Sequence, residues 1–400
     1  MASDASGSRR SDDLAPKAAF YNDPKIRGYF YQAVVVLLLA WGIWSIVSNT
    51  IENLQTRNIA QGFGFLDVTA GFDLSVALID YPKNATYGRA ILVGIVNTLV
   101  VAVIGIFFAT LLGFIIGVAR LSKNFVIQRL ATGYVETIRN LPLLLQLFFW
   151  YFGVLSFLPN PRDSLKPMGE AIFINNRGFF VPEIVLAPGI AQGMLIAAAI
   201  AVAAAVLVRN WAKRRQDLTG KPFPVGLTAA GLVLGLPLLV FVVSGAAIQL
   251  VYPVKGAFNV TGARVVPEFI ALLLALTSYT AAFIAEIVRA GIMAVSHGQT
   301  EAARSLGLSP SHTLRLVVIP QAMRVIIPPL TSQYLNLTKN SSLAVAVGYP
   351  DLVYIGGTVL NQTGQSVEVV AIWMLIYLTI SVATSAFMNW YNRRVAIVER

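Results

Sequence analysis

The chain contains 400 residues, of which 56% are hydrophobic and only 12% are charged, and its mean hydropathy is +0.69. Soluble domains carry roughly 25% charged residues, so this composition excludes a disordered chain and a water-soluble globular protein. The net charge of +11 comes with basic residues that gather in particular loops, which indicates membrane orientation rather than nucleic-acid binding.

The N-terminal segment, residues 1–29, is polar and contains five basic residues. No apolar stretch follows Arg9 and Arg10 closely, and no small-residue cleavage site is present, so the segment differs from a signal peptide. We expect a disordered cytoplasmic tail, followed by an uncleaved membrane anchor over residues 30–47.

Eight segments are long and apolar enough to cross a bilayer, which requires about 20 residues. The predicted spans are 30–47, 90–118, 141–158, 190–208, 225–252, 266–288, 325–347 and 367–389. Pro328, Pro329 and Lys339 interrupt the seventh span. Backbone groups freed by proline need partners inside the protein, so we expect this helix to be packed rather than exposed to lipid.

Lysine and arginine are distributed unevenly between the two sets of loops. With both termini in the cytoplasm, the cytoplasmic segments carry 21 of these residues and the opposite loops carry 8. Cytoplasmic loops are enriched in basic residues, so the pattern predicts cytoplasmic termini and an even number of spans.

Residues that could carry enzyme chemistry are scarce. The two histidines, His297 and His312, do not form an HExxH motif, and the chain has no cysteine for a thiolate site. The one Gly-Lys pair, Gly220-Lys221, is followed by proline and does not complete a phosphate-binding Walker A sequence. We therefore expect no metal, no cofactor and no ATP bound by this chain.

The loop over residues 289–324 has a distinctive pattern. A short helix is expected before Gly307, followed by a second helix with Ser309 as its N-cap and Pro310 in its first position. Small residues at 302 and 303 would let another surface approach closely. The segment before the glycine reads Glu301-Ala302-Ala303-Arg304-Ser305-Leu306-Gly307, and Val317-Val318-Ile319-Pro320 follows nine residues later.

Two other interpretations of this loop are an ordinary connection and a DNA-reading helix-turn-helix. The second is disfavoured because the segment is tethered between two spans with only two basic residues nearby. The spacing of Glu-Ala-Ala, glycine and the later apolar-x-apolar-proline resembles the EAA loop of permeases in ATP-binding-cassette (ABC) importers. That resemblance implies that residues 301, 302, 303, 305, 306, 307 and 309 form a coupling helix that docks on an ATPase.

Further segments resemble the polar amino acid permease family. They are NTL at 97–99, ARLS at 119–122, YVETIRNLPLLLQ at 134–146, AEIVRAG at 285–291 and LTKNSSL at 337–343. The matching halves, 90–158 and 266–395, are separated by about one hundred extra residues containing two predicted spans. This layout is similar to the Q-type permeases of general L-amino acid importers.

The composition predicts an all-α polytopic membrane protein with about eight spans, and the resemblance implies the type I importer permease fold. It also implies alternating access, L-amino acid import across the bacterial inner membrane, and broad or acidic and amide specificity. The implied partners are an ATPase homodimer that binds ATP and Mg²⁺, a homologous second permease, a periplasmic binding protein and membrane lipid, but no nucleic acid.

We expect the chain to divide into five parts. They are the tail (1–29), the first span with a periplasmic loop (30–89), the first part of the permease core (90–158), the insertion (159–260) and the second part of the core with the EAA loop (261–400).

A polar cluster within the seventh span is a candidate substrate pathway. Lys339 is followed by Asn340, Ser341 and Ser342, and a charge inside a membrane costs a few kcal/mol unless it is paired or reaches the interface. Lys339 could bind a substrate carboxylate, pair with a carboxylate such as that of Glu286, or lie near the outer surface. Glu286 could contribute to the pathway or form a structural ion pair with Arg289, three residues later.

Two functions of other classes remain possible from the residues alone. An ion-coupled secondary transporter would favour acidic relays inside the membrane and inverted repeats, neither of which is evident. A membrane-embedded enzyme would need a catalytic cluster, and the sequence contains no recognisable one.

Overall fold

A computed structural model describes residues 24–56, 61–185, 187, 189–221, 223–245, 249–256 and 260–395. Within them, seven helices are long and apolar enough to cross a membrane, or eight when one bent pair is counted as a span. The expectation of an all-α membrane protein with about eight spans is confirmed. Residues 1–23 of the predicted tail lie outside the described residues, and residue 24 already begins the first helix.

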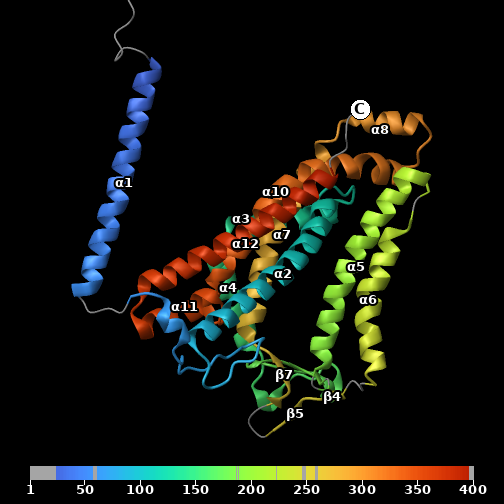
Figure 1. Cartoon of the computed structure of the whole chain (residues 1–400). Coiled ribbons are helices and arrows are strands. Elements are labelled where there is room, and N and C mark those ends of the chain that lie inside the picture. The colour runs from blue at the N-terminus through green and yellow to red at the C-terminus, as the bar shows by residue number, and fades with distance from the viewer. Residues whose placement is uncertain are drawn as a thin grey trace, which may run out of the picture.

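Helices provide most of the ordered chain (Figure 1). The α-helices are α1 Pro24–Thr56, α2 Tyr87–Ala119, α3 Phe125–Asn140, α4 Leu143–Phe148, α5 Ile190–Thr219, α6 Val225–Val243, α7 Pro267–Met293, α8 His297–Ser305, α9 Pro310–Thr313, α10 Ile319–Asn340, α11 Leu352–Thr363 and α12 Ser366–Val395. The 3₁₀ segments are η2 Phe63–Asp67, η4 Leu155–Phe157, η5 Pro161–Asp163, η6 Gly169–Ala171 and η8 Ser341–Val347, and the π-helical segments are η3 Phe149–Val154 and η7 Leu314–Val318.

The centre of the bundle is formed by α2 and α7, which pack closely because α2 presents glycines to α7. A Cβ at Gly117 would lie 2.8 Å from the carbonyl oxygen of Ala285, and one at Gly113 would lie 2.6 Å from the Cβ of Ile284. Small residues at a helix interface let two backbones approach closely in a membrane. Helix α10 packs on α7 through the buried side chains of Ala322, Ile326, Ile327, Leu330 and Leu337. The proline-interrupted span therefore has one face packed inside the protein, whereas Pro328 and Pro329 are exposed, so its shielding from lipid stays a prediction.

The third predicted span, 141–158, matches the arm Leu143–Phe157, which is built from α4, η3 and η4 and is preceded by a sharp bend. Helices α3 and α4 meet at an angle of 108°, and the second arm continues through η3 and η4 to Phe157. Leu141 has extended dihedral angles of −99° and 130°, because the residue before a proline avoids the helical region. Pro142 then precedes the first residue of α4.

The insertion forms a helical hairpin of α5 and α6, which pack on each other and stand apart from the α2–α7 bundle in Figure 1. The predicted span 225–252 is wrong at its end, because α6 stops at Val243 and β4 follows. The chain turns at Gly245, which has a φ of +62°.

Among the described residues, seven short strands, which the sequence did not predict, lie at the end of this hairpin where α5 begins and α6 ends. They are β1 Phe173–Asn175, β2 Gly178–Val181, β3 Glu183–Val185, β4 Gln249–Val251, β5 Val254–Lys255, β6 Val260–Thr261 and β7 Ala263–Val265. The antiparallel pairs β2–β7 and β3–β4 join the chain before α5 to the chain after α6, with Phe179 opposite Val265 and Ile184 opposite Leu250. These strands lie at the end of the molecule opposite α8 (Figure 1).

Residues 348–366 were expected to form a loop, but they contain the helix α11. The side chain of Asp351 caps its N-terminus by accepting a hydrogen bond of 2.8 Å from the backbone N–H of Tyr354. Asn97 of α2 donates to the carbonyl of Pro350 at 2.9 Å, which fixes α11 against the bundle.

Candidate functional site

The 301–307 segment forms a helix followed by a sharp, hydrogen-bonded stop. The N–H of Gly307 donates to the carbonyl of Arg304 at 2.9 Å, and the N–H of Leu308 donates to that of Ala303 at 3.1 Å. This pair of bonds is a Schellman motif, which needs a residue in the left-handed region after the helix. Gly307 supplies it with a φ of +79°. The expected helix and glycine break are both present.

The second arm of the elbow begins as expected. Ser309 is the N-cap of α9 and its hydroxyl accepts from the backbone N–H of His312, while Pro310 occupies the first turn. The chain then continues through η7 into α10. A side-chain hydrogen bond of 3.3 Å from Gln321 to Gln299 ties α10 to α8, a contact that the sequence analysis missed.

The two alanines of the elbow do not share a face, contrary to the expectation. Ala302 is exposed, whereas Ala303 is 4% exposed and packs within its own chain. Consecutive helical residues do not face the same direction, so only one of the two can point outwards. The outer surface of the elbow includes Glu301, Ala302, Arg304, Ser305 and Leu306, and Leu306 is 82% exposed.

The second candidate site surrounds Lys339 near the end of α10. Lys339 is exposed and lines a hollow of about 330 Å³ together with Ser342, Val353, Trp373, Met374 and Tyr377. The aromatic lining from α12 was not anticipated, because Trp373 and Tyr377 are distant in sequence and lie in an otherwise apolar segment.

The polar residues next to Lys339 have different environments. Ser341 is buried and its hydroxyl donates to the carbonyl of Thr338 at 2.7 Å. The hydroxyl of Ser342 donates to the carbonyl of Lys339 at 2.8 Å, and Asn340 is partly exposed. Ser341 is therefore engaged inside the protein, whereas Ser342 reaches the hollow.

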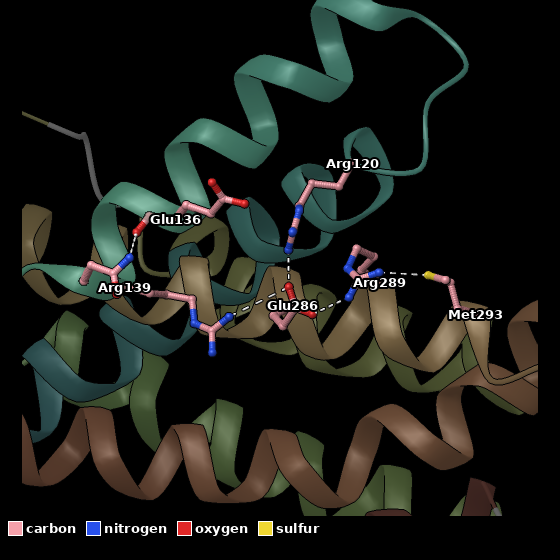
Figure 2. Close-up of polar contacts among 7 residues, drawn as sticks. Arg120, Glu136, Arg139, Glu286, Arg289 and Met293 are labelled. Carbon is pink, nitrogen blue, oxygen red and sulfur yellow. Dashed lines mark hydrogen bonds and ion pairs between the residues drawn. The ribbon is translucent and has the colours of Figure 1, made fainter.

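Glu286 does not join Lys339, so the alternative of a Lys339–Glu286 pair is wrong. Figure 2 shows Glu286 between the guanidinium groups of Arg120, Arg139 and Arg289. The Arg289 contact, 2.6 Å between Nη2 and Oε1, is the structural ion pair that the sequence suggested. The arginines at 120 and 139 lie within recognised segments, but the sequence contains no signal that they meet Glu286.

Metal chemistry has no candidate among the described residues, where no group of three or more His, Cys, Asp or Glu side chains could hold an ion. The two candidate sites are thus a protruding elbow and a lysine-lined hollow. The first has an exposed apolar tip that suits docking on another protein, and the second has a cation that suits a carboxylate.

Comparisons with known proteins give a family match over the C-terminal part of the chain and relatives that cover nearly all of it. The family described as "binding-protein-dependent transport system inner membrane component" matches residues 225–397. The general L-amino acid transport system permease protein AapQ of Rhizobium johnstonii is 55% identical over 386 residues, 96% of each chain. The putative amino-acid ABC transporter permease protein YhdX of Escherichia coli is 49% identical over 395 residues, 98% of this chain and 100% of the relative. The glutamate/glutamine/aspartate/asparagine transport system permease protein BztB of Rhodobacter capsulatus is 41% identical over 425 residues. The match covers 96% of this chain and 98% of the relative.

Proposed function

This chain belongs to the family of binding-protein-dependent inner membrane permease subunits of ABC importers, and from that premise we propose that it imports L-amino acids into the cytoplasm. The family consists of transport subunits whose ATP is hydrolysed by a separate ATPase subunit. Family membership gives no support to the ion-coupled alternative. The observation that carries the proposal is 55% identity across 96% of both chains.

The substrate class that we propose is broad and includes the acidic amino acids and their amides. Its support is the set of similar proteins, whose names specify general L-amino acids in one case and glutamate, glutamine, aspartate and asparagine in another. All of these substrates share an α-carboxylate and an α-ammonium group, so a cation that holds the carboxylate would serve every one of them.

We propose that α8 is the coupling helix and that its outer residues contact the ATPase. Leu306 supplies an exposed apolar side chain at the tip, and Glu301 lies within the helix beside exposed Ala302 and Ser305. Ala303, Gly307 and Ser309 shape the elbow from within through burial, the left-handed turn and the N-cap.

The substrate pathway that we propose runs past the Lys339 hollow. The ammonium group of Lys339 would hold the carboxylate of the amino acid, and Ser342, Trp373 and Tyr377 would contact the rest of it. Asn340 is the partly exposed neighbour of Lys339 in the sequence, and Ser341 supports the backbone next to the hollow. Glu286 belongs to a separate cluster.

The assembly that we propose has two permease subunits, this chain and a homologous partner. A pair of ATPase subunits, binding ATP and Mg²⁺, and a periplasmic amino acid-binding protein complete it. Closure of the ATPases would move the two coupling helices and switch the permease pair from inward-open to outward-open. The parts at 90–158 and 261–400 form the core in this scheme, and 159–260 is an insertion at its edge.

Uptake and crosslinking together test these proposals. Vesicles containing the whole complex should accumulate labelled glutamate, glutamine, aspartate and neutral L-amino acids in a vanadate-sensitive manner. Uptake that depends on an ion gradient and ignores vanadate would contradict the function.

The cysteine-free chain also allows a direct test of docking. Leu306→Cys should crosslink to cysteines around the ATPase groove. Leu218→Cys is the matched control, because Leu218 is 86% exposed at the end of α5, near the same end of the molecule as α8. Crosslinking at 218 but not at 306 would refute the coupling role of α8.

A further inference from the structure

A single carboxylate, that of Glu286, holds arginines from three helices (Figure 2). Arg120 follows the last residue of α2 and its Nη1 donates to Oε2 of Glu286. Arg289 of α7 donates to Oε1 at 2.6 Å, and Arg139 in the last turn of α3 lies 3.8 Å from Oε2. The cluster is therefore the point at which α2, α3 and α7 are joined electrostatically.

The cohesion of this cluster, which we call the Glu286 joint, depends strongly on its one negative charge. Three cations surround one anion, and the Nε atoms of Arg120 and Arg289 are buried without a hydrogen-bond partner among the described residues. Removing the charge of Glu286 would leave like charges facing one another at close range, which is strongly unfavourable for partly buried groups. Loss of this charge should thus release the helices from each other.

Helix α3 is attached to α7 mainly by polar contacts. The hydroxyl of Tyr134 donates to the carbonyl of Ser278 at 2.8 Å, and the guanidinium of Arg139 lies 5.0 Å from the centre of the Phe283 ring. Ala131 and Val135 are its buried residues. Because only two residues of α3 are buried, the polar contacts of Tyr134 and Arg139 make a large part of what holds α3 to α7.

The bend between α3 and α4 is itself rigid. The side-chain amide of Gln146 donates to the carbonyls of Ile138 and Leu141, at 2.9 and 3.0 Å. These bonds satisfy the free carbonyls at the end of α3 and fix the direction of α4. A displacement of the end of α3 is therefore passed on to α4.

The joint lies close to the coupling helix. Glu286 is two turns before the end of α7 at Met293, and α8 begins at His297. A Cβ at Gly291 would collide with Ile326 of α10, so the last turns of α7 are packed tightly against α10. Movement of α8 would thus reach the end of α7 directly.

From this geometry, and resting on the proposed coupling role of α8, we propose that Glu286 is a positioning residue. It transmits the movement of α8 through Arg139 to the rigid α3–α4 bend, while Arg120 keeps the end of α2 in the same unit. Glu286 does not touch the substrate in this role.

Distance measurements in the whole reconstituted complex test this transmission. Spin labels at Leu306 on α8 and at Leu130 on α3 would each be measured against a label at Met168, which precedes η6 and the strand β1; all three side chains are exposed. Both distances should change between the nucleotide-free and vanadate-trapped states. In Glu286→Gln the change at 306 should remain and the change at 130 should disappear.

Transport provides a second readout that a purely structural role would not move. In Glu286→Gln, the amount of amino acid transported per ATP hydrolysed should fall, because the variant loses the charge that attracts Arg139 and that strengthens the hydrogen bonds from Arg120 and Arg289. Assembly with the ATPase should be retained. Glu136→Gln is the matched control, since the carboxylate of Glu136 is exposed on α3 and forms none of the ion pairs. It should behave like the parent.

A milder variant keeps the proposal falsifiable if Glu286→Gln fails to assemble. Arg139→Gln leaves the Arg120 and Arg289 contacts intact, and it should reproduce both the loss of movement at 130 and the lower transport per ATP. Arg139→Lys keeps the positive charge and should restore part of the movement and part of the transport. Normal movement at 130 in Arg139→Gln would overturn the proposal. If label 306 fails to move in the parent, the coupling role of α8 fails instead.

Discussion

Gly307 is required by its backbone conformation rather than by lack of space. Its φ is +79°, and an added Cβ would meet nothing within 4 Å. Left-handed dihedral angles cost a residue with a Cβ about 1 kcal/mol, although asparagine tolerates them better than most. The elbow geometry, and not a steric clash, should therefore set the effect of substitution.

We expect uptake to decrease in the order Gly307, Gly307→Asn, Gly307→Ala and Gly307→Val, with membrane insertion unchanged. Gly307→Asp should lose uptake because it also places a negative charge beside the exposed tip. Uptake in vesicles, normalised to the amount of assembled complex, measures this order. Equal activity of the Asn and Val variants would show that the left-handed turn is not needed.

Asp351 is a buried carboxyl outside the membrane-spanning helices, and burial raises its pKa to about 7. In the unfolded chain an aspartate has a pKa of about 4. Between these values the folded protein binds a proton that the unfolded chain has lost, so stability should fall as pH rises from about 4 to about 7.

The test is the melting temperature of the purified complex across this pH range. Asp351→Asn keeps an oxygen that can cap α11 and removes the titration, so its profile should be flatter. Asp351→Ala should lower stability below about pH 4 by about 1 kcal/mol through loss of the cap, and its profile should also be flatter because the titrating carboxyl is gone. A parent profile that is already flat would contradict the burial argument.

At the scale of single residues, local chemistry could be predicted and distant contacts could not. The N-cap at Ser309 and the break at Gly307 depend on neighbouring residues, so the sequence identified them. Arg289 was identified as a partner of Glu286 because it lies one helical turn away. Arg120 is 166 residues away along the chain, and its contact depends on how α2 and α7 pack.

At the scale of helices, the α2–α7 contact depends on glycines of α2. A larger residue at these positions would force the two helices apart. The carbonyl of Ala285 is backbone, so it cannot rotate away from a Cβ at Gly117. Gly133 on α3 is the opposite case, because a Cβ there would meet nothing within 4 Å. An alanine at 133 would also favour the helix by up to about 1 kcal/mol.

We therefore expect Gly117→Ala to lower the melting temperature of the complex and Gly133→Ala to leave it unchanged or raise it. The two variants make the same chemical change in a helix and differ in what the new methyl group meets. Thermal unfolding of the purified complex measures both. A Gly117→Ala protein as stable as the parent would show that α2 and α7 are packed less closely than described.

The positions of the long helices followed from apolar length, whereas bends and strands did not. Apolar length cannot show that the chain turns by 108° between α3 and α4, at the start of the predicted span 141–158. The strands are two to four residues long, and β2 pairs with β7 across the whole insertion. This pairing depends on the positions of the ends of α5 and α6 in the fold. A local sequence pattern does not reveal those positions.

At the scale of the whole molecule, α5 fixes two groups of residues at opposite ends. It runs unbroken over 30 residues, about 45 Å, which exceeds the hydrocarbon thickness of a bilayer. Lys213–Arg215 lie near its C-terminal end, and the strands lie at its N-terminal end (Figure 1). The two groups must therefore face different compartments if α5 crosses the membrane.

From the basic residues near the end of α5 we predict that this end, together with α8, is cytoplasmic. We expect Arg214→Cys to react with a membrane-impermeant maleimide only after cells are permeabilised, and Thr261→Cys, exposed in β6, to react in intact cells. The chain has no other cysteine, so each signal comes from one position. Labelling of position 214 from outside would reverse the orientation and would place α8 on the wrong side for an ATPase driven by cytoplasmic ATP.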